Sequence, residues 1–216
     1  SKKLLIFTYL LYPFFIINTM KKLPLLVLLT LTTVASALED NLSFPFTPDS
    51  VKNWKFFSDQ VMGGLSEGNV SLEQDGEMTF IRLSGNVSTE NNGGFIQLRT
   101  STSMSNKPLM FKSIHNSRKD GKKIKGVRLN VRGNGETYHV FIQPSIFHWL
   151  PIDFHIATFD TSPDWAIVEI PFNQFKKRSN KKQSNFDAKD IKTFAIVAYG
   201  RYFKSDVSVS SIEFYY

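Results

Sequence analysis

The side chains that most often perform acid–base, nucleophilic or metal chemistry are sparse in this sequence and form no recognisable constellation. Cysteine is absent, which excludes thiolate nucleophiles, disulfides and cysteine-held metals. The four histidines are scattered, and none is flanked by a nucleophile motif such as G-x-S-x-G: His115, His139, His148 and His155. We therefore predict that the protein is not an enzyme and carries no cofactor and no metal.

Two weaker alternatives for chemistry stay open. His139 and His155 lie in strand-like patterns and are candidates to face one another across a sheet, but two imidazoles without a third ligand at a telling spacing make a poor metal site. The nearest acidic cluster that a hydrolase of an envelope polymer would use as acid and base consists of Asp153, Asp160 and Asp164. Solvated acids at loops and strand ends are the favoured interpretation of that cluster.

Two glycine-rich segments carry the polar groups best suited to binding. In the first, Asp59 precedes Met62-Gly63-Gly64 and Ser66, and its carboxylate suits either a turn cap or an acceptor for a sugar hydroxyl or a partner's amide. The second, Asn91-Asn92-Gly93-Gly94, is a strong turn signal whose amides also suit a polyhydroxyl ligand. We favour a turn for both segments, with binding as the alternative.

Aromatic side chains are plentiful, with 3 Trp, 7 Tyr and 20 Phe, and in a chain without disulfides most of them should pack in the core. Trp54 and Trp165 are predicted to do so. Trp149 lies on a predicted loop, where it packs locally or stacks on a sugar face. The candidate ligand- or partner-binding residues are therefore Asp59, Met62, Gly63, Gly64, Ser66, Asn91, Asn92 and Trp149.

The segments around these candidates alternate apolar and polar residues, as half-buried strands do. The clearest runs are Met78 to Leu83, Gly94 to Arg99, Val127 to Arg132 and Tyr138 to Ile142. Further strand candidates are Asp153 to Phe159, Ala166 to Ile170, Thr193 to Ala198 and Val207 to Tyr216. Because strands follow one another without intervening helical patterns, the sequence predicts an all-β sandwich.

The N-terminal segment has the layout of a secretory signal peptide. Met20-Lys21-Lys22 precedes the apolar run Leu23 to Leu31, and Ala35-Ser36-Ala37 supplies a cleavage site. The run is too short to span a membrane, which takes roughly 20 apolar residues. We predict a start at Met20, with a longer unusual leader as the alternative, and one domain over residues 38–216 that is exported to the periplasm or secreted.

The charge of the chain argues against nucleic acid as a partner. The formal net charge is +7, but four lysines lie in the leader, so the predicted mature chain carries +3. That excess is too small for a phosphate-tracking surface. Basic runs at Lys122–Lys125 and Lys176–Lys182 are interpreted as solvated loops, with peripheral contact to an anionic membrane as the alternative.

Several motifs together resemble one family. Trp54, Ser58–Ser66, Asn91–Phe95 and Val131–Tyr138 occur in the order typical of the complex I intermediate-associated protein 30 (CIA30) family. The resemblance continues through Phe159, Trp165, Ile170–Phe175, Gly200 and Ile212–Tyr216. It implies a galactose-binding-like jelly-roll β-sandwich.

The same resemblance implies a chaperone-like assembly factor for respiratory complex I, which is the role of the mitochondrial members. An exported chain works in a different compartment, so a protein client or membrane complex of the envelope is the expected partner. A carbohydrate-binding module of the cell envelope is the alternative function, because a jelly roll with Asn-, Asp- and Trp-rich loops also suits sugars. An envelope-polymer hydrolase is the third hypothesis.

Overall fold

The computed structural model describes residues 42–102, 108–117, 123–144 and 154–216. All of them belong to one compact unit, Asn41–Tyr216. The predicted leader and Trp149 lie outside the described residues, so both interpretations stay predictions. Among the described residues, no helix has the length and apolar character needed to cross a membrane.

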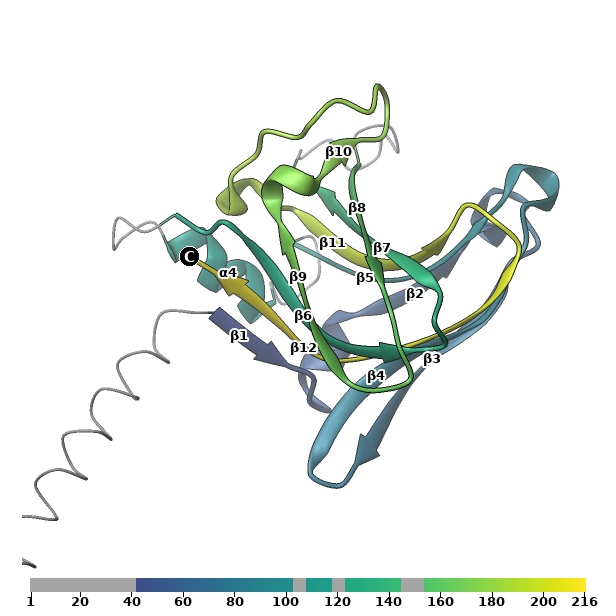
Figure 1. Cartoon of the computed structure of the whole chain (residues 1–216), viewed down its shortest axis with the longest axis horizontal. Coiled ribbons are helices and arrows are strands. Elements are labelled where there is room, and N and C mark those ends of the chain that lie inside the picture. The colour runs from purple at the N-terminus through teal and green to yellow at the C-terminus, as the bar shows by residue number, and fades with distance from the viewer. Residues whose placement is uncertain (1–41, 103–107, 118–122, 145–153) are drawn as a thin grey trace, which may run out of the picture. The chain divides into compact units, whose positions relative to one another are not determined.

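Two six-stranded antiparallel sheets stack face to face (Figure 1). The first sheet has the order β3-β4-β12-β6-β9, with β1 also paired to β12. Its strands are β1 (Leu42–Pro45), β3 (Glu67–Asp75), β4 (Met78–Val87), β6 (Gly126–Gly133), β9 (Ala166–Pro171) and β12 (Phe203–Tyr215).

The second sheet has the order β10-β8-β7-β11-β5-β2. Its strands are β2 (Lys55–Ser58), β5 (Phe95–Ser101), β7 (Thr137–Gln143), β8 (His155–Asp160), β10 (Lys176–Lys177) and β11 (Thr193–Tyr199). The predicted all-β jelly-roll sandwich is thus confirmed, and each of the eight predicted strand segments forms a strand.

One continuous core fills the space between the sheets because each strand turns alternate side chains inward. On β11 these are Phe194, Ile196 and Ala198. Strand β12 has a register shift between Val209 and Ser211, which changes the inward set from odd to even positions. Val207 and Phe214 therefore both reach the core, and full burial of such a side chain contributes about 1.5–3 kcal/mol.

A short helix, α4 (Leu109–Asn116), was not predicted from the sequence. It buries Met110, Phe111 and Ile114, which share one face of the helix at this spacing. Eight residues are too few to show a helical period clearly, and the β-rich context favoured a loop. Short 3-10 helices occupy other connections: η1 (Ser50–Asn53), η2 (Asp59–Met62), η3 (Glu90–Asn92), η5 (Phe172–Gln174) and η6 (Ala188–Asp190).

The predicted core tryptophans behave differently from one another. Trp54 packs against the core, with its ring 5.3 Å from Phe46. Trp165 instead packs 5.4 Å from Phe80, whose neighbours Ile81 and Leu83 point inward, so Phe80 and Trp165 lie on the outer face of the first sheet. The core prediction for Trp165 is wrong, because outward aromatic residues shelter one another there.

Candidate functional site

The Asp59 carboxylate joins two loops that are far apart in sequence. Asp59 begins η2 immediately after β2 and is fully buried. Its Oδ1 accepts a hydrogen bond from the Ser66 amide at 2.9 Å. Its Oδ2 accepts bonds from the Phe95 amide at 3.1 Å, from the Gly94 amide and from the Ser66 hydroxyl. One side chain therefore holds the loop before β3 against the loop before β5.

The carboxylate is ionised in this setting. Burial by itself raises the pKa of Asp59, but hydrogen bonds from Gly94, Ser66 and Phe95 favour the charged form and leave the pKa below its ordinary value of 3.8. Both oxygens already have partners in the protein. Asp59 therefore acts on any ligand only through the two loops that it holds together.

One glycine of each pair, Gly64 and Gly93, is explained by its distance from Asp59, whereas Gly63 and Gly94 have positive φ angles of 87° and 126°. A Cβ atom on Gly64 would lie 2.4 Å from Asp59 Cγ, and one on Gly93 would lie 2.4 Å from Asp59 Oδ2. No side chain fits at either position without moving the carboxylate. Glycine at positions 64 and 93 is thus a packing requirement of the buried aspartate.

Asn91 and Asn92 form the tip of the second loop. Both have positive φ angles, 53° and 59°, which asparagine tolerates better than most residues. Asn91 Nδ2 donates to the Gly63 carbonyl at 3.2 Å, a second link between the two loops. Both asparagine side chains are exposed, so the turn interpretation fits the geometry while their predicted contact with a ligand stays a prediction.

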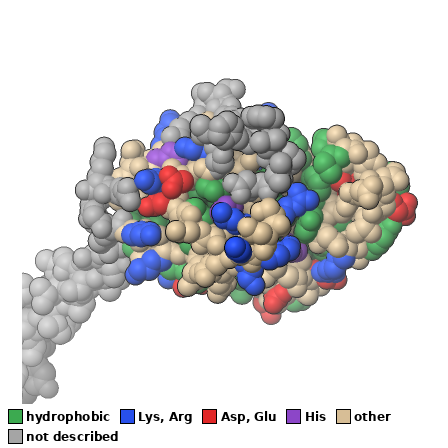
Figure 2. Space-filling model, turned by 90° about the horizontal axis from the view of Figure 1, so that it is seen from above, with side chains coloured by type: hydrophobic (Ala, Val, Ile, Leu, Met, Phe, Trp, Pro, Cys, Tyr) green, Lys and Arg blue, Asp and Glu red, His purple; other side chains and the backbone are tan. Residues whose placement is uncertain are grey.

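The locked first loop turns apolar side chains outward. Val61, Met62 and Leu65 are 72%, 62% and 49% exposed, and Tyr202 on the neighbouring turn is 58% exposed. The Tyr202 hydroxyl donates to Glu90 Oε1 at 3.0 Å, which ties that turn to the second loop. We call these four residues the loop-end surface. Figure 2 shows hydrophobic side chains exposed at the right-hand end of the molecule, where Figure 1 places these loops.

The predicted site residues therefore separate into two groups. Asp59, Gly64 and Ser66 are buried and build the loops, whereas Met62, Gly63, Asn91 and Asn92 are exposed on them. Val61, Leu65 and Tyr202 were not selected from the sequence. For Val61 and Leu65, the sequence signal was an apolar residue inside a glycine-rich turn. Such turns lie at the protein surface, where apolar side chains are not easily buried.

Gly64 to Gly68 has the spacing G-x-S-x-G of a nucleophile motif, which the sequence prediction did not take into account. The Ser66 hydroxyl is buried, donates to Asp59 and accepts from the Ser88 amide at 3.0 Å. Its described partners include no histidine, so the geometry gives Ser66 a structural role.

The open alternative that His139 and His155 face one another is excluded by the strand register. In the register of β7 and β8, His155 lies opposite Ile142, which points into the core, whereas His139 shares the outer face with Phe141. The two rings therefore lie on opposite faces of the sheet. Within the described part of the chain, no three His, Asp or Glu side chains gather as metal ligands would.

The acidic cluster is also only partly described. Asp153 lies outside the described residues, and Asp160 is exposed and accepts a hydrogen bond from Thr137 Oγ1 at 2.6 Å. Asp164 is likewise exposed. These positions agree with the solvated acids favoured from the sequence.

The basic run from Lys176 to Lys182 forms β10 and the turn after it, and most of its cationic side chains are exposed. The Lys181 φ angle of 60° marks the tip of that turn. Contact of this turn with an anionic membrane stays a prediction.

The outer face of the second sheet carries a cluster of aromatic rings, of which Phe141 is buried and Phe154 and Tyr199 are half-buried. Phe141 lies 5.4 Å from Tyr199 and 5.6 Å from Phe154 between ring centres. The His139 ring lies 6.1 Å from Phe141 and 5.6 Å from Tyr199, and its buried Nδ1 has no hydrogen-bond partner. The buried Nε2 of Gln143, two residues beyond Phe141 on β7, also has none. Burial lowers the pKa of His139, which leaves the ring neutral near pH 7.

Arg99 extends that face toward β2. Its guanidinium lies 4.0 Å from the centre of the Phe57 ring, and burial lowers its pKa. Aromatic rings alternate here with amide, imidazole and guanidinium groups, as they do in sites that recognise polar, ring-shaped ligands.

The sandwich fold is similar to that of two solved carbohydrate-binding modules. A family 11 carbohydrate-binding module from Clostridium thermocellum, in complex with a β-1,3-1,4-mixed-linked tetrasaccharide, matches with a TM-score of 0.58 and 14% identity, over 82% of this chain and 95% of the module. The family 11 module of a cellulosomal cellulase of Clostridium thermocellum matches with a TM-score of 0.54 and 14% identity, over 76% and 87%. At such identity the likeness shows the fold alone.

The sequence identifies the family. The model of the complex I intermediate-associated protein 30 (CIA30) family matches residues 44–208. Because this match covers most of the chain, the protein belongs to the CIA30 family, and the resemblance noted from its motifs is confirmed. No match is found among curated proteins.

Proposed function

We propose that this protein is a non-catalytic binding protein that assists the assembly of a membrane or respiratory complex by docking on a protein client. The observation that carries the proposal is the loop-end surface. Three of its four apolar side chains lie within five consecutive positions, on a loop fixed by the buried Asp59. Family membership supports the assembly role.

The loop-end surface has the physical properties of a docking site. Its backbone is already ordered by bonds to Asp59 and by the link from Asn91 to Gly63, so binding costs little further conformational entropy. Met62 adapts its shape easily to a partner surface, and Tyr202 combines an apolar ring with a polar tip. Clustered apolar side chains of this kind mark interaction sites more often than isolated ones do.

The proposed place of action is the cell envelope, outside the cytoplasm. Support comes from the signal-peptide layout of residues 20–37. The client is then a membrane-associated subunit whose exposed apolar surface awaits its own partner.

The test is affinity purification from the cell envelope followed by mass spectrometry. We expect subunits of one membrane complex to be enriched, and their recovery to fall at least about tenfold when Val61, Met62 and Leu65 are all replaced by serine. The matched control replaces Leu72 and Ile167 by serine, two exposed apolar residues on β3 and β9. Equal recovery by the triple variant and the wild type would contradict the proposal.

Carbohydrate binding is the second candidate, favoured by the outer face of the second sheet. The half-buried Tyr199 ring, which lies 5.4 Å from Phe141, suits stacking on a sugar ring. The likeness of the fold to carbohydrate-binding modules adds support.

Calorimetric titration with a mixed-linked β-glucan tetrasaccharide and with envelope polysaccharide separates the two candidates. If the second sheet binds sugar, we expect Tyr199→Ala to weaken the affinity about tenfold, because one stacked ring contributes on the order of 1 kcal/mol or more. The triple serine variant of the loop-end surface should leave that affinity unchanged. If no sugar gives a heat of binding, carbohydrate binding is excluded as a function.

A further inference from the structure

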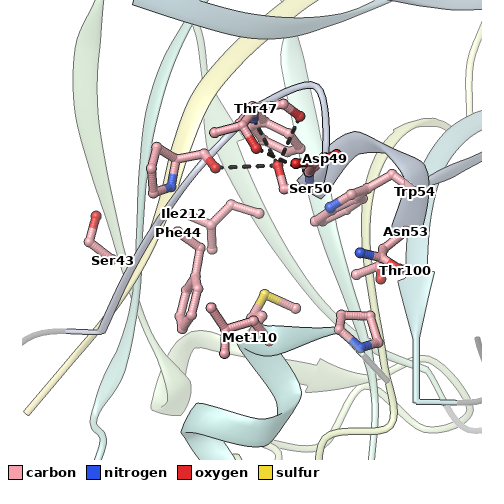
Figure 3. Close-up of a pocket in the computed structure, with 14 residues that line it drawn as sticks. Ser43, Phe44, Thr47, Asp49, Ser50, Asn53, Trp54, Thr100, Met110 and Ile212 are labelled. Carbon is pink, nitrogen blue, oxygen red and sulfur yellow. Dashed lines mark hydrogen bonds between the residues drawn. The ribbon is translucent and has the colours of Figure 1, made fainter. Parts of the chain in front are cut away.

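A pocket of about 400 Å³ lies between β1, η1 and the start of α4, away from both surfaces considered above (Figure 3). Its apolar lining comes from Phe44, Pro45, Phe46, Trp54, Pro108, Leu109, Met110 and Ile212. Six polar residues complete the lining: Ser43, Thr47, Asp49, Ser50, Asn53 and Thr100. The volume falls in the range of small-molecule sites, which is roughly 300–1,000 Å³.

The walls of the pocket are held by contacts within the protein. The Trp54 ring lies 5.3 Å from Phe46 and 6.2 Å from the core residue Phe194. At the rim, the Thr47 amide donates to Ser50 Oγ at 2.8 Å, and the Ser50 amide donates to Thr47 Oγ1 at 3.1 Å. Figure 3 shows these bonds between Thr47 and Ser50. Contacts within the protein therefore fix the shape of the cavity.

Among the polar residues of the lining, Thr100 has an unsatisfied hydroxyl. It lies on β5 and points inward with Ile96 and Leu98, and it is fully buried. Its Oγ1 has no hydrogen-bond partner. A buried hydroxyl without a partner costs stability that valine, with almost the same shape, would not cost. An oxygen atom of a ligand inside the pocket would supply the missing partner.

The charges around the pocket disfavour an ionic ligand. Asp49 is the one charged side chain in the described lining, and it pairs with Lys52 at 2.7 Å. No cation of the lining faces the interior to neutralise a buried carboxylate or phosphate, and an unpaired buried charge is costly. A neutral ligand is therefore favoured.

We propose that this pocket binds a neutral, mainly apolar small molecule that places one hydrogen-bonding oxygen against Thr100. The apolar body of the ligand packs against Phe46, Met110 and Ile212, which are buried at the floor. This ligand site is independent of the protein-docking proposal, because it shares no residue with the loop-end surface.

The test titrates the purified protein with 1-octanol and with 1-naphthol and monitors binding through amide chemical shifts in NMR spectra. We expect shifts at Thr100, Met110 and Trp54. Comparison of 1-octanol, a flexible chain, with 1-naphthol, a flat ring, shows which ligand shape the pocket prefers. Thr100→Val should weaken binding about fivefold, since one neutral hydrogen bond is lost. Octanoate, the charged analogue of 1-octanol, should bind more weakly than the alcohol.

Two controls make the outcome decisive. Thr158→Val, an exposed position on β8, should leave probe binding unchanged. In the free protein, Thr100→Val should keep or raise the melting temperature, because the hydroxyl has no partner there. The proposal is overturned if neither probe shifts these residues up to its solubility limit, if Thr100→Val binds both probes as tightly as wild type, or if octanoate binds best.

Discussion

Replacing Asp59 by alanine should lower the free energy of unfolding by about 3 kcal/mol or more. The Ser66, Gly94 and Phe95 amides and the Ser66 hydroxyl all lose their acceptor, and each buried polar group left unpaired costs roughly 1–3 kcal/mol. That loss is a large share of the 5–15 kcal/mol typical of a domain. Urea unfolding monitored by circular dichroism measures it.

Two further variants keep this prediction informative if Asp59→Ala does not fold. Ser66→Ala removes only the hydroxyl bonds and should cost about 1–2 kcal/mol. Asp49→Ala removes an exposed carboxylate paired with Lys52 and should leave stability unchanged. If Asp59→Ala were as stable as Asp49→Ala, the buried carboxylate would not hold the loops.

The same carboxylate makes stability depend on pH in a defined direction. Its pKa is lower in the folded chain than the ordinary value of 3.8, so its contribution is present above that pH and is lost as the pH falls through the folded value. Asp206 and Glu169, which accept bonds from Arg82 and Arg128, act in the same direction. The part due to Asp59 is therefore the difference between wild type and Asp59→Asn, measured from pH 7 down to pH 3.

The sandwich was predictable because the apolar and polar residues of its strands alternate in the sequence as their side chains alternate between core and solvent. Runs such as Val127 to Arg132 alternate apolar and polar residues, and the structure turns Val127, Leu129 and Val131 into the core. Four strands lie outside the eight predicted segments. Strands β1, β2 and β10 span only two to four residues, which give too short an alternation, and β3 was recognisable only as the strand-like run Gly68 to Leu72. Strand β12 changes its inward set at the register shift, which no simple period anticipates.

The location of the candidate site was predictable from the sequence, but the role of each residue in it was not. Residues of Ser58–Ser66 and Asn91–Phe95 were selected together, and the structure joins them through Asp59. A sequence does not show that a carboxylate is buried, so contact with a ligand stayed open for Asp59 as the alternative to a turn cap. The outward direction of Val61 and Leu65 follows from the loop that Asp59 fixes, and so it became visible only with the tertiary structure.

The residues of the family motif Ser58–Ser66 have two different structural roles. Its polar and glycine residues, Asp59, Gly64 and Ser66, form a rigid joint between two loops, while Val61, Met62 and Leu65 are left in solvent at the surface of that joint. In the proposed function the motif therefore preserves the shape of a docking surface rather than a catalytic or sugar-binding centre. Variants of the joint and of its surface should then affect client binding through different causes, loss of stability for the first and loss of contact for the second.

Replacing Gly64 by alanine should destabilise the protein by about 2 kcal/mol, because overpacking of this kind typically costs 1–3 kcal/mol. The new Cβ would lie 2.4 Å from both Asp59 Cγ and Oδ1, so the carboxylate must move away from the groups that it binds. The Gly135→Ala control has φ of 82° and open space around its Cβ, so it should cost only the backbone strain, about 1 kcal/mol.

A double-variant cycle identifies the cause of the Gly64 effect. If the new methyl group acts by displacing the Asp59 carboxylate, the Gly64→Ala change should matter less once Asp59→Ala has removed that carboxylate. The free energy of unfolding of the double variant should then fall by about 1 kcal/mol less than the sum of the two single losses. Additive losses would mean that Gly64→Ala acts elsewhere in the loop. Client recovery by Gly64→Ala, measured well below its melting temperature, should also fall, because the side chains of Met62 and Leu65 move with the joint that Gly64 completes.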